Sequence, residues 1–431
     1  MKKLFIILLL SHCAVAQNYT LKKCIEVATA NNPAYQKTFL TAEVAATNVD
    51  QAKARRLPQT QFTVSQGMNF GRSIDRFSND YINQMYNSTY SGLQVSVPVF
   101  KGFQRQFLVE SSKFLEEAEK FNIDTEKNRL TLNILKAYLE VLATKEMVQV
   151  AEKQLQNSRT QYDRQEKQLQ AGITGKLEQV QFANQVAMNE GGLIEAKTSL
   201  QAARLALFQL MNLKPVDAIE FESLDLSESL SFGIIPEEKD PSTFLPEYKS
   251  LDIQSQSIDR QIKANNAEKM PEINLFGNYG TFYASSNPER TFIQQINDTR
   301  NGSVSLGINI PIFSGILVKP RTQQLKVQKR ILENTVSQNK NLLNQELETA
   351  KLMLRAFQER LENAGRQVEI SKENLHLVEL RIEAGTINPL EFQVAQASME
   401  SAQATQIQSK YRLILQKKLL SFYYTGEFDF L

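Results

Sequence analysis

The stretch Val95-Ser96-Val97-Pro98-Val99-Phe100-Lys101-Gly102 recurs further along the chain as Ile308-Asn309-Ile310-Pro311-Ile312-Phe313-Ser314-Gly315. The two copies lie 213 residues apart, and other landmarks keep this offset without a gap. These landmarks are Pro33 and Pro246, Tyr35 and Tyr248, Leu57-Pro58 and Met270-Pro271, Ala171-Gly172 and Ala384-Gly385, and Leu177-Glu178 and Leu390-Glu391. A period of this length is far above that of a solenoid repeat, so it indicates two fused copies of one structural module.

The repeated stretch ends the second strand of a predicted hairpin in each module. Apolar residues alternate with small or polar ones, which is the period of a strand with two different faces. The apolar positions are Leu93, Val95, Val97 and Val99, and Val304, Leu306, Ile308, Ile310 and Ile312. The preceding strand of each hairpin places Phe62, Val64, Met68 and Phe70, or Ile273, Leu275 and Tyr279, on one face. Each strand has about ten residues, enough to cross a bilayer at a tilt. Segments 71–89 and 283–301 are rich in Asn, Ser, Arg and Asp, so we expect solvated loops there.

After each hairpin the spacing of the apolar residues changes to that of a helix. Six apolar residues at seven-residue spacing predict a supercoiled helix in each module. They are Ile134, Val141, Val148, Leu155, Tyr162 and Leu169, and then Leu347, Leu354, Leu361, Val368, Leu375 and Ile382. A helix over 102–169 would be roughly 100 Å long at about 1.5 Å per residue. Ala171-Gly172 and Ala384-Gly385 predict the ends of these helices, and returning helices are expected over 177–213 and 390–422.

The first part of each module is also predicted to be helical. Thr20 is a suitable N-cap for a helix from Leu21, which we expect to be interrupted at Pro33 and to end before Pro58. The counterpart in the second module covers about 246–269. Residues 214–242 contain three prolines and read as a connecting segment. The predicted organisation is therefore a first repeat over 17–213, a connector over 214–242 and a second repeat over 243–431.

Residues 1–16 read as a secretory signal peptide, with a basic start, a short apolar core and the cleavage site Ala14-Val15-Ala16. A membrane anchor is the alternative, but seven apolar residues cannot cross about 30 Å of hydrocarbon. Lipidation at Cys13 is a second alternative, although the bulky His12 stands where such signals carry a small residue.

The composition excludes several classes of function. Without Lys2 and Lys3 the chain carries 47 basic and 47 acidic residues, so it lacks the positive charge expected of a nucleic-acid-binding protein. After processing only Cys24 and His376 remain of their types, so a zinc site or a Cys/His nucleophile pair is not expected. We expect no catalytic residues, no metal and no cofactor, and therefore no enzyme.

The exposed apolar faces of the strands suggest a wall between lipid and water. A soluble sandwich is the alternative, but rod-like helices have the wrong shape to cover those faces. An open sheet edge is not tolerated in hydrocarbon, so four strands per chain require several chains to pool their strands. Two chains would give eight strands with a filled interior, and three would give twelve with room for a passage. We therefore expect a homotrimer in contact with membrane lipid.

The order of these elements, present twice, resembles the TolC-like outer membrane efflux protein family. The resemblance covers nearly the whole mature chain and includes the opening L-K-K-C-I-E-V-A-T-A-N-N-P of residues 21–33, the two strand ends and the Ala-Gly turns. It implies a mixed α and β membrane protein, with a trimeric twelve-stranded β-barrel continued by a long α-helical coiled-coil barrel. It further implies an outer membrane channel that passively conducts substrate from an inner-membrane transporter and a periplasmic adaptor, in efflux or type I secretion. A periplasmic adaptor or coiled-coil scaffold is the alternative function.

The resemblance also implies site residues. The adaptor-contacting tips match Ala171, Gly172, Ile173 and Thr174, and Ala384, Gly385, Thr386 and Ile387. The first acidic position of the family's pore constriction matches Glu178 and Glu391, which three-fold symmetry would turn into rings of negative charge. The second acidic position is Gln181 in one repeat and Val394 in the other, a departure that weakens the expectation of strong cation selectivity.

Overall fold

The computed structural model describes residues 17–215, 219–223, 240–312, 315–384 and 389–428. The predicted signal peptide lies outside these residues. Contacts divide the chain into two compact units, which are described separately here. The first unit takes in residues up to Phe39, Asn122–Tyr248 and the residues from Gln338 on. The second unit is Leu40–Phe121 with Lys249–Ser337. Each unit contains residues of both sequence repeats. The boundaries of the repeats at 17–213 and 243–431 therefore remain a prediction.

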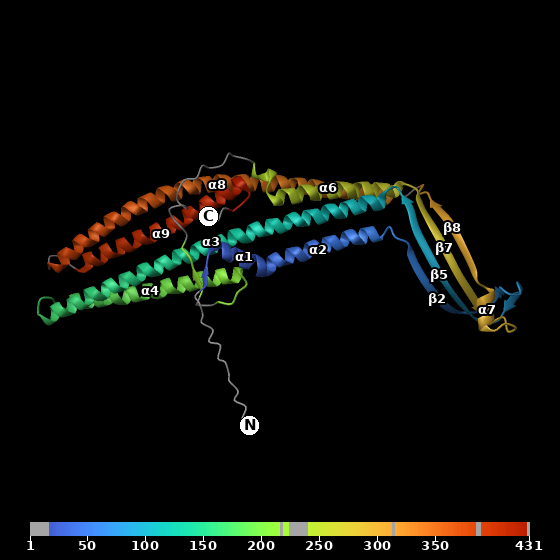
Figure 1. The fold of residues 1–431 in the computed structure, drawn as a ribbon, viewed down its shortest axis with the longest axis horizontal. Helices are drawn as coiled ribbons and strands as arrows, with labels where there is room; N and C mark the ends of the chain where they lie inside the picture. Colours follow the sequence, from blue (N-terminus) through green and yellow to red (C-terminus); the bar gives the residue numbers. More distant parts are fainter. Residues whose placement is uncertain (1–16, 216–218, 224–239, 313–314, 385–388, 429–431) are drawn as a thin grey trace, which may run out of the picture. The chain divides into compact units, whose positions relative to one another are not determined.

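The second unit contains a four-stranded antiparallel sheet, in the order β2-β5-β7-β8 (Figure 1). The strands are β2 (Gln59–Asn69), β5 (Tyr86–Lys101), β7 (Glu272–Ala284) and β8 (Asn301–Asn309). The register pairs Phe62 with Leu93 and Leu93 with Tyr279, so the predicted apolar positions share one face. Several side chains on that face are exposed in the single chain, among them Phe62 at 67% and Val304 at 80%. The two predicted hairpins are confirmed, and β2 and β8 are the edges of the sheet.

The repeated Val-Pro-Val-Phe motif contains a break in the strand pairing. Pro98 pairs with Asn274, whereas Phe100 rather than Val99 pairs with Ile273. Proline has no N–H to donate to the ladder, and a β-bulge accommodates it at this point. The strict alternation expected through Val99 therefore ends at Pro98, and β5 extends to 16 residues.

The segments that join the strands of each hairpin have more structure than the sequence predicted. The first contains a short hairpin of β3 (Arg72–Ile74) and β4 (Tyr81–Asn83), and the second contains helix α7 (Phe292–Asp298). Helix α7 begins with a reciprocal capping box between Thr291 and Gln294. The fully buried Gln295 fixes the loop, because its amide donates to the carbonyl oxygens of Asn287 and Arg290 at 3.2 and 3.0 Å.

The long helices begin beside the sheet. Helix α3 (Gln104–Gln170) follows β5, and helix α8 (Gly315–Glu383) follows β8. Gly102 and Phe103 both adopt positive φ, at 53° and 62°, and this double turn redirects the chain from strand to helix. Helix α2 (Pro33–Ala54) leads into β2, and α6 (Pro246–Asn266) leads into β7 through a single 3-10 turn. These helices match the predicted ones.

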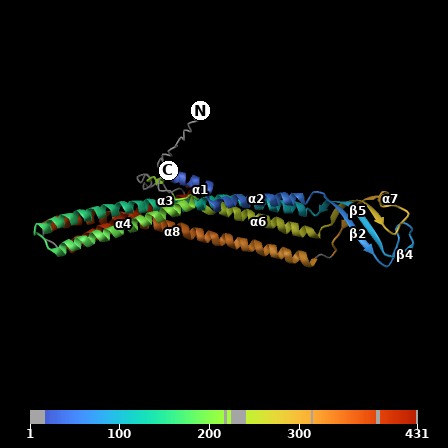
Figure 2. The same ribbon diagram turned by 90° about the horizontal axis from the view of Figure 1, so that it is seen from below.

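In the first unit each long helix is followed by a returning helix. Helix α4 (Lys176–Leu210) returns along α3, and α9 (Pro389–Thr425) returns along α8, as Figure 1 shows. The view in Figure 2 also shows α3 and α4 side by side. The heptad residues face the packed side, since Ile134 and Val141 are at most 1% exposed and Leu347 and Leu354 are 6% exposed. Among the described residues, no helix combines the length and apolar character that a membrane span needs.

The connecting segment contributes to the core, which the sequence did not predict. Strand β1 (Gln17–Tyr19) pairs in parallel with β6 (Ile219–Phe221), and helix α1 (Leu21–Asn31) follows with Thr20 accepting from Lys23 N at 3.1 Å. The buried Tyr138 of α3 donates its hydroxyl to the carbonyl oxygen of Glu222 at 2.6 Å. Residues 216–218 and 224–239 of the connector are outside the described part of the chain.

Candidate docking tips and pore constriction

The first helical tip is an ordered turn whose apolar side chain is exposed. Gly172 has φ 71°, a left-handed conformation that costs glycine little. Ile173 N donates to Gln168 O at 2.9 Å, and Gly172 N donates to Leu169 O at 3.0 Å. This pair of bonds is the Schellman motif, which satisfies the last carbonyls of α3. Ile173 nevertheless remains 71% exposed, so the turn presents an apolar side chain without a core to cover it.

Glu178 lies in the first turn of the returning helix α4. Gly175 is the N-cap and makes no side-chain cap bond. A Cβ added at Gly175 would lie 2.8 Å from Oε2 of Glu178, so the carboxylate folds back over the start of the helix. A negative charge at this position is favoured by the helix dipole. Glu178 therefore stabilises the start of α4 whether or not it faces a pore.

The second tip is described only in part. Ala384 follows the last residue of helix α8 and is exposed, whereas the predicted tip residues Gly385, Thr386 and Ile387 lie outside the described residues. Glu391 occupies the first turn of α9, as Glu178 does in α4. Its carboxylate is 3.8 Å from Arg381 across the α8–α9 hairpin, and both side chains are more than half exposed.

The structure joins the two hairpins directly behind their tips. The rings of Phe182 on α4 and Phe392 on α9 lie 5.8 Å apart, and each residue is only 2% exposed. They form a small core with Val378 and Ala395. Gln393 Nε2 of α9 donates to the backbone carbonyl oxygen of Gln181 in α4 at 3.2 Å. Gln181 stands where the resemblance places the second acid of the constriction, so this position takes part in the contact between the two hairpins.

Sequence reasoning missed this aromatic joint, although the repeat alignment contains a signal for it. At the offset of 213, Gln179 corresponds to Phe392 and Phe182 corresponds to Ala395. At the first of these two positions the second repeat has the large side chain, and at the second position the first repeat has it. The two repeats therefore contribute different side chains to this contact, in which the rings of Phe182 and Phe392 pack against each other.

A pocket of about 640 Å³ lies further along the same helices and contains a second acid that sequence reasoning missed. It is lined by residues of α3, α4 and α9, including Met147, Met188, Val394 and Glu400. Burial raises the pKa of the Glu400 carboxyl, while a hydrogen bond from Gln396 Nε2 at 3.1 Å opposes that shift. The described residues contain no cluster of three or more His, Cys, Asp or Glu that could hold a metal ion.

Comparison with known families rests on the same elements. The family described as Outer membrane efflux protein matches residues 24–213 and 246–421, which together make up most of the chain and follow the two repeats. The chain belongs to the outer membrane efflux protein family. It is therefore an outer membrane channel with helices in the periplasm, and not an enzyme, as the sequence predicted. The family assignment excludes the alternative function of a periplasmic adaptor or scaffold.

Individual members of the outer membrane efflux protein family are distant in sequence. The chain is 21% identical to the alkaline protease secretion protein AprF of Pseudomonas aeruginosa, over 92% of this chain and 82% of AprF. Among solved structures, CusC matches at 18% identity with a TM-score of 0.80, covering 94% of this chain and 91% of CusC. The Campylobacter jejuni CmeC channel matches at 16% identity with a TM-score of 0.80, covering 95% and 86%. The fold is that of trimeric outer membrane channels.

Proposed function

We propose that this channel works as a homotrimer that docks by its helical tips to a periplasmic adaptor of an inner-membrane transporter, and passively conducts the transporter's substrate outward. The observation that carries the proposal is the exposed Ile173 on a turn whose backbone is closed by the two bonds of the Schellman motif. A rigid turn with an uncovered apolar side chain loses little entropy on binding and gains from burial. Three chains would present three copies of this turn, together with the ends of three α8–α9 hairpins.

The sheet supports the proposed trimer. Strands β2 and β8 have only one neighbour each within the described chain, and open edges are not tolerated in hydrocarbon. Edge pairing between three chains closes twelve strands around a passage. The name of the relative AprF refers to the secretion of an alkaline protease. A secreted protein is therefore one candidate substrate of this channel, beside small solutes.

We also propose that Glu178 and Glu391 line the constriction at the tip end. Both stand at the equivalent position of a returning helix, and the aromatic joint of Phe182 and Phe392 holds these helices together. Three copies of each carboxylate would attract cations. The double variant Glu178→Gln with Glu391→Gln should lower cation-over-anion permeability in planar bilayers. Unchanged selectivity would show that the two acids serve only the starts of their helices.

The docking proposal is tested by Ile173→Asn. The matched control is Ile194→Asn, because Ile194 is a similarly exposed isoleucine, at 67%, in the middle of α4. We expect the tip variant to assemble into trimers at normal yield, to lose chemical cross-linking to the adaptor and to lose export in cells without the wild-type channel. The control should keep all three properties. Normal export by a correctly assembled Ile173→Asn trimer would refute docking through this tip.

A further inference from the structure

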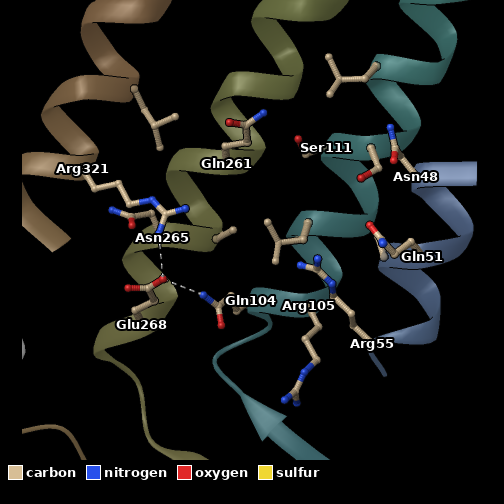
Figure 3. A pocket seen from close by; sticks show the side chains of 16 residues that line it. Asn48, Gln51, Arg55, Gln104, Arg105, Ser111, Gln261, Asn265, Glu268 and Arg321 are labelled. Carbon is tan, nitrogen blue, oxygen red and sulfur yellow. Dashed lines mark hydrogen bonds and ion pairs between the residues drawn. The ribbon is translucent and has the colours of Figure 1, made fainter. Parts of the chain in front are cut away.

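The second unit contains a pocket whose lining includes none of the tip residues and neither Glu178 nor Glu391. It lies between α2, α3, α6 and α8, close to where these helices meet the strands, and has a volume of about 560 Å³ (Figure 3). That volume is within the range of small-molecule sites. All of its lining residues belong to the second unit, so its geometry does not depend on the tips or on the first unit.

The charge in this pocket is predominantly positive. Three arginines, Arg55, Arg105 and Arg321, line it with a single carboxylate, Glu268. Figure 3 shows Arg55 and Arg105 on one side and Arg321 with Glu268 on the other. Glu268 is already engaged, because it accepts from Gln104 Nε2 at 3.1 Å and lies 3.9 Å from Arg321.

Two of the arginine guanidinium groups, those of Arg55 and Arg105, are not fully neutralised by the carboxylates that the structure describes. Arg105 is 3.7 Å from Glu272, which also pairs with Lys101 at 3.2 Å, so that carboxylate is shared between two cations. In the part of the chain that the structure describes, no carboxylate pairs with the guanidinium of Arg55. Guanidinium groups bind carboxylate and phosphate in two-pronged geometry, and such charge-assisted bonds are stronger than neutral ones.

The walls of the pocket are held by buried hydrogen bonds. Asn265 Nδ2 donates to Val318 O at 2.9 Å and to Thr322 Oγ1 at 2.8 Å, which ties α6 to α8. The hydroxyl groups of Ser111 and Ser257 lie 2.8 Å apart in a buried contact that ties α3 to α6. A pocket fixed in this way requires little reorganisation when a ligand binds.

The remaining lining has an apolar part and an amide-rich part. The apolar residues are Ala52, Leu108, Leu115, Ala264 and Leu325. A ligand with an apolar body and one anionic group would therefore match both the cationic and the aliphatic parts of the wall. We propose that this pocket binds an amphiphilic organic anion, with a phosphate or carboxylate held by Arg55 and its apolar body against the leucines.

The test uses the full-length protein in nanodiscs of zwitterionic phosphatidylcholine, with 1-naphthyl phosphate as the probe and calorimetry as the readout. We expect saturable binding at one site per chain, and at least tenfold weaker binding of 1-naphthol and of inorganic phosphate. Arg55→Gln should weaken probe binding about tenfold, the effect of losing a charged hydrogen-bond partner. The matched control Arg330→Gln removes the same charge from an exposed position of α8 outside the pocket and should leave binding unchanged.

Glu268→Gln provides a variant that should bind more tightly, an outcome that misfolding cannot imitate. The substitution keeps an acceptor for Gln104, removes the competing negative charge and frees Arg321, so affinity should rise about threefold. Absence of saturable binding, equal effects of Arg55→Gln and Arg330→Gln, or weaker binding by Glu268→Gln would each overturn the proposal.

A second experiment distinguishes a lipid headgroup from a dissolved anion as the natural ligand of the pocket. Nanodiscs with added phosphatidylglycerol test whether a lipid headgroup occupies the pocket. Competition that weakens probe binding in wild type but not in Arg55→Gln supports the site and assigns it to a phospholipid. Unchanged probe binding supports the site and assigns it to a dissolved anion. Binding is measured without an adaptor or a transporter, so failure of this proposal is distinguishable from failure of the docking proposal.

Discussion

The half-buried ion pair between Lys410 and Glu146 gives the sharpest stability prediction. Lys410 Nζ lies 2.6 Å from both carboxylate oxygens, and the Tyr411 hydroxyl donates to Glu146 Oε1 at 2.7 Å. The side chains of the pair are 18% and 30% exposed. Burial first, and then the bond to Glu146, raise the pKa of Tyr411, so this hydroxyl stays protonated and remains a donor.

Lys410→Met should destabilise the first unit by about 2 kcal/mol per chain. Breaking a fully buried pair costs about 3–5 kcal/mol, while an exposed pair is worth below about 1 kcal/mol. Partial exposure places this pair between those limits, and Tyr411 would still hydrogen-bond the remaining carboxylate. The loss arises mainly from leaving Glu146 charged and unpaired. The double variant Lys410→Met with Glu146→Gln should therefore recover at least half of the lost stability.

The assay is the thermal midpoint of the helical circular dichroism signal, compared at one scan rate in one detergent. Lys197→Met is the matched control, because Lys197 pairs with Glu152 at 3.3 Å while both side chains are more than half exposed. We expect the order wild type and Lys197→Met, then the double variant, then Lys410→Met. A double variant that melts at or below Lys410→Met would refute the reasoning, because neutralising the orphaned carboxylate would then have gained nothing.

Gly172→Ala should destabilise the tip by about 1 kcal/mol through its positive φ alone, since no atom lies within 4 Å of the added Cβ, whereas Gly191→Ala inside α4 should stabilise that helix, by the same thermal assay. Burial, and then Glu346, raise the pKa of Glu247 above its ordinary 4.5, so the folded state prefers the protonated form and loses stability as pH rises through the raised value. Glu247→Gln should accordingly raise the melting midpoint at pH 7 and have little effect at pH 4; an equal gain at both pH values would contradict this sign. Burial raises the pKa of the Cys24 thiol to about 12, so maleimide at pH 8 should label it slowly in the native protein and rapidly in urea, and rapid native labelling would contradict its burial.

The sequence was most informative where one chemical requirement repeats along the chain. The heptads predicted α3 and α8 because a supercoiled helix needs an apolar residue every seven positions, and Ile134 and Leu347 are buried as that requirement demands. The alternation of Val304, Leu306 and Ile308 predicted a two-faced strand for the same kind of reason.

The sequence was least informative where a contact depends on two distant segments. Strand β1 has three residues, and its partner β6 lies about 200 positions away, so neither carries a periodic signal of its own. The bulge at Val99 arises from the missing N–H of Pro98, a local detail that the smooth apolar alternation conceals. At the tips, the exposure of Ile173 and the bond from Gln393 to Gln181 depend on how the hairpins pack, which spacing within one helix does not specify.

The two repeats share a backbone plan but differ in chemistry where their hairpins meet. The joint places Phe182 from one helix against Phe392 from the other, while the equivalent positions hold Gln179 and Ala395. Phe182 and Phe392 pack in one small core with Val378 and Ala395, so the two hairpins of a chain contribute different side chains to it. In the proposed trimer the two kinds of hairpin would alternate around the ring, which would then have three-fold rather than six-fold symmetry. Under the docking proposal, an adaptor built from identical subunits would therefore meet two different kinds of hairpin end.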